Sequence, residues 1–106
     1  MTPRATTKQP AALAVLRGRI EKTDDTILGL LKKRMGLARM IGVTKAAAGL
    51  PVLDPAREAR VVRRAAARAR ALQMPAEEVR SLFWSIIALC RSEQIQARIT
   101  AARSRK

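Results

Sequence analysis

Histidine and tyrosine are absent from this chain of 106 residues, and aromatic residues make up only 2% of it. Without histidine, neither a histidine-activated nucleophile nor a histidine-ligated metal site is possible. The single cysteine, Cys90, excludes an intramolecular disulfide. The core must be built from aliphatic side chains and methionine, a composition that favours packed helices over sheets.

Long hydrophobic runs are also missing. No apolar stretch is long enough to span a membrane. The polar segment Met1–Pro10 lacks the apolar centre of a secretory signal. We therefore expect a cytoplasmic protein that has no membrane partner.

Positive charge is abundant, with a formal net charge of +14. Such a charge is typical of proteins that bind nucleic acid or an anionic surface. The arginines are nevertheless scattered among alanines, and this composition can also reflect the base composition of a genome. Nucleic-acid binding by a basic helical dimer is therefore kept as an alternative function.

Apolar residues with 3-4 spacing predict three helices and no strand. The first helix follows the apolar residues from Leu13 to Ile41 and ends near Gly49. The second begins at Asp54-Pro55, with aspartate as N-cap and proline in the first position, and ends near Leu72. The third is opened by Pro75. The predicted fold class is all-α, with three helices per chain and a long N-terminal helix.

The length of the first helix predicts how the chain assembles. About 36 helical residues span about 54 Å, whereas a compact chain of this size has a radius of gyration of about 13 Å. A second copy is needed to cover such a helix, so we expect an intertwined homodimer. Residues 1–10 are expected to form a flexible tail, residues 11–100 the helical domain and residues 101–106 a basic C-terminal tail.

Arg34 occupies a position where the sequence pattern calls for an aliphatic residue. Ile20, Ile27 and Ile41 repeat every seventh residue, and Arg34 is the missing member of that series. Lys45 lies about 20° around the helix from Arg34, three turns further on. Two cations on an apolar seam need an anion, because an unpaired buried charge is costly. That anion is either a carboxylate of the protein or a bound ligand.

Other polar residues share these predicted faces. Gln94 falls on the apolar stripe of the third helix, and Asp54, Arg57 and Glu58 lie within the first turn of the second. Arg17 lies about 25 Å along the first helix from the Arg34 position, too far to serve the same pocket. In a dimer, Arg17 would reach the pocket of the partner.

Each residue also has a purely structural interpretation. Arg34 could pair with a core carboxylate, and Lys45 could complement the helix dipole or extend to water. Asp54 could act only as a helix cap, and Glu58 could form a solvated surface pair with Arg57.

Gln94 could be an ordinary polar contact between helices, and Cys90 a small buried hydrophobic residue. As a set, three cations, one amide and an acidic cluster would line a pocket that has no general base or nucleophile. Such a site suits a small dianion whose reaction needs charge stabilisation and conformational restraint.

The order and spacing of these residues resemble the all-helical chorismate mutases of the AroQ class, also called type II. The resemblance extends from about Leu13 to Gln94. It is carried by Leu16-Arg17-x-x-Ile20, Asp24, Leu30-Leu31-x-x-Arg34, Lys45, Pro51-Val52, Asp54-x-x-Arg57-Glu58, Leu82-Phe83-x-x-Ile86-Ile87 and Gln94.

The resemblance implies an intertwined homodimer with two active sites and the Claisen rearrangement of chorismate to prephenate. This reaction is concerted and intramolecular, so it requires no cofactor and no metal. It belongs to the synthesis of phenylalanine and tyrosine.

The resemblance also implies a role for each site residue. Arg34 and the partner's Arg17 would bind the two substrate carboxylates, and Arg57 would add positive potential. Lys45 and Gln94 would donate hydrogen bonds to the ether oxygen.

At the other group of the substrate, Glu58 would accept a hydrogen bond from the ring hydroxyl, with help from the Asp54 backbone. Two positions depart from the bacterial relatives. Cys90 replaces a serine that contacts a carboxylate, and Arg91 replaces an apolar residue.

Three further alternatives stay open. Isochorismate-pyruvate lyases resemble this chain in Arg17, Arg34, Lys45 and Gln94, but their loop lacks the acid at Glu58, which favours the mutase. A mutase acting on 4-amino-4-deoxychorismate would also tolerate that acid. The third alternative is a structural dimerisation module, in which none of these residues would take part in catalysis.

Overall fold

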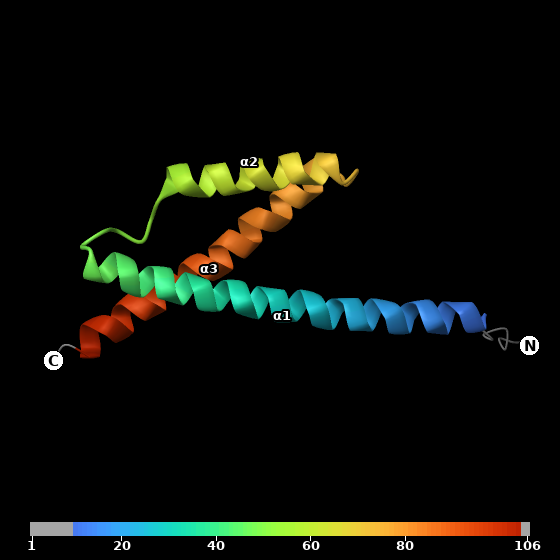
Figure 1. Cartoon of the computed structure of the whole chain (residues 1–106), viewed down its shortest axis with the longest axis horizontal. Coiled ribbons are helices and arrows are strands. Elements are labelled where there is room, and N and C mark those ends of the chain that lie inside the picture. The colour runs from blue at the N-terminus through green and yellow to red at the C-terminus, as the bar shows by residue number, and fades with distance from the viewer. Residues whose placement is uncertain (1–9, 105–106) are drawn as a thin grey trace, which may run out of the picture. The chain divides into compact units, whose positions relative to one another are not determined.

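The computed structural model describes residues 10–104, which form three α-helices and no β-strand (Figure 1). Helix α1 spans Ala11–Ala47, α2 spans Pro55–Ala71 and α3 spans Ala76–Ser104. The predicted all-α fold class with three helices and a long first helix is confirmed.

The sequence explains where α1 ends. Gly49 adopts φ +70°, a left-handed conformation that glycine reaches without steric cost. The N–H of Leu50 then donates to the carbonyl of Lys45 at 2.8 Å, which satisfies an otherwise unpaired carbonyl of the last turn. Lys45 therefore lies in the last turn of α1, next to the loop that leads to α2.

Asp54 begins α2 as the sequence predicts. Its side-chain Oδ1 accepts a hydrogen bond from the N–H of Arg57 at 3.1 Å, and Pro55 occupies the first helical position. This cap places Arg57 and Glu58 in the first turn of α2, close to the end of the loop from α1.

The chain divides into two compact units within α1, one ending at Lys32 and the other beginning at Lys33. The described part of the first unit is a single helical segment. Its large apolar side chains are exposed, including Ile20 at 60% and Ile27 at 50%. One helix has no second element against which to bury its apolar face, so this segment forms no core of its own.

The second unit contains the core. Small and aliphatic side chains supply it, with Ala38 from α1, Val62, Ala65, Ala66 and Ala69 from α2, and Ile87, Cys90 and Ala97 from α3. Small residues allow the helix backbones to approach closely, and α3 crosses the C-terminal part of α1 (Figure 1).

Two predicted segments lie at the edges of the described residues. Residues 1–9 of the expected N-terminal tail are outside them. Helix α3 continues to Ser104, four residues into the segment expected to be a basic tail. The boundaries of the helical domain stay a prediction. Within residues 10–104, none of the helices has the length and apolar character needed to cross a membrane.

Candidate active site

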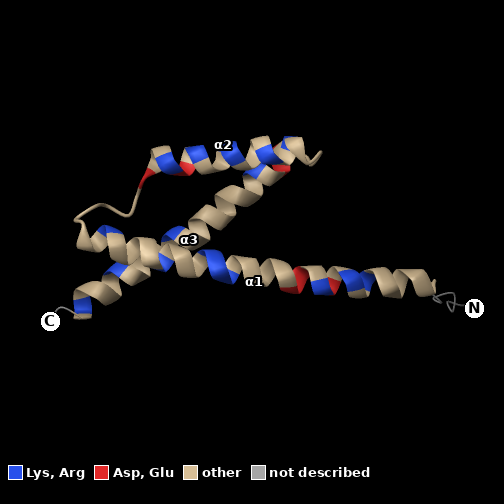
Figure 2. Cartoon of the chain, in the orientation of Figure 1, with Lys and Arg blue, Asp and Glu red and all other residues tan. Residues whose placement is uncertain are grey.

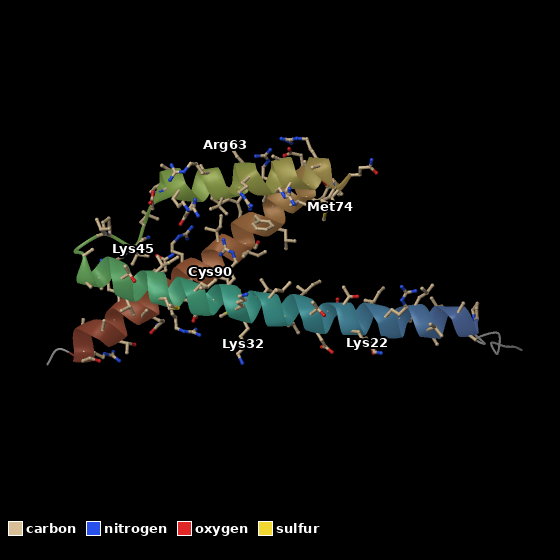
Figure 3. The ribbon with its side chains drawn as sticks, viewed as in Figure 1. Lys22, Lys32, Lys45, Arg63, Met74 and Cys90 are labelled. Carbon is tan, nitrogen blue, oxygen red and sulfur yellow. The ribbon has the colours of Figure 1, made fainter. Side chains whose placement is uncertain are left out.

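A pocket of about 450 Å³ lies in the second unit, with walls from all three helices. Seven of the eight site residues predicted from the sequence line it: Arg34, Lys45, Asp54, Arg57, Glu58, Cys90 and Gln94. The eighth, Arg17, belongs to the first unit and is not among the lining residues. Figure 3 labels Lys45 and Cys90, which enter the pocket wall from α1 and α3.

Gly42 sets how closely α1 approaches α3 beside this pocket. A Cβ atom at Gly42 would lie 2.7 Å from the backbone oxygen of Gln94 and 2.9 Å from its Cα. It would also lie 3.2 Å from the Cβ of Ala97. Distances below 3.0 Å to backbone atoms cannot be relieved by a side-chain rotation. Only glycine at this position therefore permits the observed contact between the helices.

Lys45 and Gln94 form a directly hydrogen-bonded pair in the pocket. The Lys45 Nζ donates to the Gln94 Oε1 at 3.0 Å and to the backbone oxygen of Val52 at 2.8 Å. Lys45 therefore does more than complement the helix dipole, because its ammonium group also forms these two hydrogen bonds. Because Gln94 accepts through its oxygen, its amide NH₂ has no partner among residues 10–104. Both side chains retain protons that a ligand could accept.

Arg34 is half-buried, and it makes no hydrogen bond or ion pair with any residue between Pro10 and Ser104. The structural ion pair considered from the sequence therefore has no carboxylate partner in this range. A half-buried guanidinium carries five N–H donors, and desolvating them without partners is costly. An anionic ligand would satisfy these donors.

Asp54 and Arg57 are exposed residues of the pocket lining. The Asp54 carboxylate already accepts the capping hydrogen bond from the Arg57 N–H, so its role as a helix cap is confirmed. The Arg57 guanidinium has no acidic partner among the described residues. Arg57 therefore adds an uncompensated positive charge at the edge of the pocket.

Glu58 pairs with Arg91 of α3, not with Arg57 as one interpretation of the sequence suggested. The Arg91 Nε donates to Glu58 Oε2 at 2.8 Å, and its Nη2 donates to Oε1 at 2.7 Å. The Glu58 side chain is 16% exposed. The hydrogen bonds from Arg91 hold the pKa of the Glu58 carboxyl below its ordinary value, outweighing the opposing effect of burial. Glu58 is therefore an ionised acceptor at neutral pH.

Cys90 is 3% exposed and forms part of the pocket wall. Its burial agrees with the interpretation as a small hydrophobic residue. The apolar part of the wall consists of Leu37, Ala38, Ile41, Val61 and Ile87, none of which is among the predicted site residues. Ile41 and Ile87 were on the predicted apolar stripes, so their periodicity was the available signal.

A larger groove of about 940 Å³ adjoins the pocket and shares Arg34, Arg57 and Val61 with it. Basic residues are distributed along α2 (Figure 2), and several of them line this groove. The groove lining contains no carboxylate; its arginines are Arg34, Arg57, Arg60, Arg63, Arg64 and Arg68, and its apolar residues are Val61, Ala65, Ala69, Leu72, Met74, Val79 and Phe83. We call this surface the arginine groove.

Taken together, the second unit presents an all-helical pocket with several cations, one amide and two carboxylates. No cluster of three or more potential metal ligands occurs among the described residues. Such a site can bind and orient a small anion, and it can stabilise negative charge that develops on an oxygen atom.

A family model described as chorismate mutase type II matches residues 16–95. The match includes all eight predicted site residues and most of the chain. The chain therefore belongs to the chorismate mutase type II family, and the resemblance inferred from the sequence is confirmed.

Known proteins match the chain over most of its length. A conserved hypothetical protein from Pyrococcus furiosus has a solved structure with a TM-score of 0.67 and 35% sequence identity, covering 81% of this chain and 99% of that one. A 3-dehydroquinate dehydratase from Pyrobaculum aerophilum is 32% identical over 86% of this chain. A T-protein from Enterobacter agglomerans is 35% identical over 69% of this chain. The chain spans only 27% and 20% of these two curated relatives.

Replacing Gly42 by alanine tests the helix contact that positions Gln94. The added Cβ requires α1 and α3 to separate, so we expect a loss of about 1–3 kcal/mol in the free energy of unfolding. Urea denaturation measures this loss. Gly36→Ala is the matched control, because its nearest neighbour would be the Arg39 Nη2 at 3.8 Å. It should stabilise α1 by up to about 1 kcal/mol. Equal effects of the two substitutions would contradict the role assigned to Gly42.

Proposed function

We propose that this protein is a chorismate mutase, which converts chorismate to prephenate by an intramolecular Claisen rearrangement in aromatic amino-acid biosynthesis. Membership of the family supports this function. The observation that carries it is Arg34, whose half-buried guanidinium has no partner among residues 10–104 and lines the pocket with the other cations. The substrate is a dianion that could supply the missing carboxylate.

The proposed mechanism needs neither a nucleophile nor a cofactor. In the rearrangement, the ether C–O bond breaks while a C–C bond forms within the same molecule. The protein lowers the barrier by holding the reactive conformer and by stabilising the negative charge that grows on the ether oxygen. Even a modest enzymatic acceleration of about a millionfold corresponds to about 8 kcal/mol.

Lys45 and Gln94 are the proposed donors to the ether oxygen. Their direct hydrogen bond of 3.0 Å keeps the two side chains together, and Val52 restrains the Lys45 ammonium further. Donors that are already in place stabilise developing charge without a reorganisation cost at the moment of reaction.

Arg34 is the proposed ligand of one substrate carboxylate, with Arg57 adding positive potential. Glu58 is the proposed acceptor for the ring hydroxyl, and the Asp54 backbone assists it. The ionised state of Glu58 supports this role, because a carboxylate accepts hydrogen bonds and a protonated carboxyl also donates.

A homodimer is part of the proposal, with Arg17 reaching the pocket of the partner chain. The arginine groove offers apolar and basic surface beside the pocket. The segment 11–32 offers exposed apolar side chains together with Glu21, Asp24 and Asp25. A partner's segment lying in the groove would bury apolar surface, and its three acids would pair with arginines of the groove. The segment also carries four cations, Arg17, Arg19, Lys22 and Lys32. Since groove and pocket share three residues, such a helix would run beside the substrate.

Two related activities are compatible with the fold. The presence of Glu58 in the pocket lining favours a mutase over an isochorismate-pyruvate lyase, whose resemblance to this chain does not extend to that acid. A mutase acting on 4-amino-4-deoxychorismate is the remaining related option. A cytoplasmic location stays a prediction.

Offering purified protein chorismate and isochorismate separately tests the proposal. We expect prephenate from chorismate and no salicylate from isochorismate. Arg34→Leu should lower prephenate formation by about a hundredfold or more, because one carboxylate loses its partner. The variant should stay folded, since removing an unpaired half-buried charge does not destabilise the core.

Lys33→Leu is the control for that substitution, because Lys33 is the exposed neighbour of Arg34 and lines neither the pocket nor the groove. It should retain activity. A wild-type protein that forms no prephenate, or an Arg34→Leu variant with full activity, would refute the assignment. Salt-dependent binding of DNA without turnover would instead support the nucleic-acid alternative.

The pH dependence of turnover tests the assignment of Gln94. A neutral amide donates at any pH, and the lowered pKa of Glu58 keeps its carboxylate ionised above that pKa. Activity should therefore persist from about pH 5 to 8 and fall only as the pH drops through the Glu58 pKa. Gln94→Glu should be active only at low pH, where the new carboxyl is protonated. A steep fall of wild-type turnover between these pH values would count against Gln94 as a donor.

Mixing two inactive variants tests the shared site. Arg17→Ala and Arg34→Ala should each be nearly inactive, because every site in either homodimer lacks one arginine. Co-refolding them in equal amounts gives half heterodimers, each with one intact site, so about a quarter of wild-type activity should return. No recovery in mixtures shown by mass spectrometry to contain heterodimers would exclude a contribution of Arg17 across the interface.

A further inference from the structure

Arg91 and Glu58 form a bidentate ion pair at the wall of the pocket. We propose that Arg91 is a positioning residue that makes the Glu58 carboxylate prefer a neutral hydroxyl group over a cationic amine on the substrate. The inference rests on the proposed function and names the substrate preference of the same site.

The geometry of the pair fixes the Glu58 carboxylate in one orientation. Both of its oxygens accept from a single planar guanidinium, at 2.8 and 2.7 Å. A fork of this kind restrains the rotation of the carboxylate, which one hydrogen bond would not do. Each oxygen keeps further acceptor capacity for a donor in the pocket.

Arg91 acts from behind the pocket wall. It is not a lining residue, whereas Glu58 is, and so are its neighbours on α3, Cys90 and Gln94. Arg91 therefore influences the ligand through Glu58 without offering a donor of its own to the pocket. Its side chain is 31% exposed, so the pair is held at the boundary between the pocket wall and water.

Charge explains the proposed preference. Glu58 alone would attract an ammonium group, because a carboxylate in a half-buried position gains more from a cation than from a neutral donor. Arg91 already supplies that cation, so the pair has no net charge. The other charged groups acting on Glu58 are Lys45, which is cationic, and Asp54, which is anionic. An incoming ammonium would thus meet an acceptor whose charge is already compensated, while a hydroxyl needs only the acceptor.

A second ion pair on α3, between Arg80 and Glu77, differs from the Arg91–Glu58 pair in geometry and exposure. Arg80 contacts Glu77 through one contact of 3.4 Å, and the Glu77 side chain is 78% exposed. The Arg80 side chain is 32% exposed, almost the same as that of Arg91. Arg80 is therefore a matched control, since its removal deletes the same chemical group from the same helix away from the pocket.

The test compares chorismate with 4-amino-4-deoxychorismate at neutral pH. For each protein, kcat/KM is measured on both substrates, and the ratio of amine to hydroxyl substrate is the quantity of interest. Arg91→Met, which keeps much of the side-chain length, should raise this ratio by about fivefold or more. Arg91→Lys keeps the charge without the fork and should give a smaller rise. Arg80→Met should leave the ratio unchanged.

A second measurement separates positioning from stability. In Arg91→Met, the pKa of Glu58 should return toward its ordinary value, so the acidic limb of the kcat/KM profile for chorismate should move to higher pH. Circular dichroism and thermal melting establish whether each variant is folded. A variant that only lost stability would lower turnover of both substrates without moving the ratio or the profile.

The outcomes distinguish the two proposals. Turnover of chorismate by the wild type with an unchanged ratio in folded Arg91→Met and Arg91→Lys would overturn the role of Arg91 and leave the mutase in place. No turnover of either substrate by the wild type would overturn the proposed function, and the role of Arg91 with it. A rise in the ratio in both Arg91 variants, but not in Arg80→Met, would establish it.

Discussion

The close contact between α1 and α3 at Gly42 is the constraint on which the pocket depends. It joins backbone to backbone, because the atoms nearest to a Cβ at Gly42 belong to the main chain of Gln94. Lys45 follows Gly42 by three residues on the same helix, so the contact fixes both donors of the proposed site at once. Helix packing thus brings the two backbones close enough for their side chains to form the hydrogen bond of 3.0 Å.

The carboxylates of the pocket do not cancel its cations. Asp54 is engaged as the cap of α2, and Glu58 is engaged by Arg91, which lies outside the lining. Arg34 therefore keeps its charge without a partner among residues 10–104 although two acids line the same pocket. The pocket stays attractive to an anion because its three cations, Arg34, Lys45 and Arg57, outnumber its two acids, and Arg91 compensates the charge of one of those acids.

Much of the fold could be predicted because the helix boundaries depend on local chemistry. Asp54 with Pro55 begins one helix, and Gly49 permits the left-handed turn that follows another. The positions of Lys45 and Gln94 followed from helical periodicity, since a helix fixes which residues share a face. Such signals lie within a few turns of sequence, where spacing alone determines geometry.

The pair between Glu58 and Arg91 could not be predicted in this way. The two residues are 33 positions apart on different helices, and their contact depends on how α2 and α3 cross. Sequence proximity favoured Arg57 as the partner of Glu58, but capping places the Arg57 backbone, and not its guanidinium, against an acid.

The glycines of α1 show the same limit, because the sequence alone does not tell which of them lies at a close helix contact. Among the described residues of α1, only Gly42 does so. Gly18 and Gly29 have no neighbouring atom within 4 Å of a Cβ position, and both lie in the segment whose isoleucines are exposed. The spacing of these isoleucines predicts a buried face, but no described residue of this chain covers it. The proposed second copy would cover that segment and bring Arg17 to a pocket that already holds the other seven residues, so the dimer and the active site stand as one hypothesis.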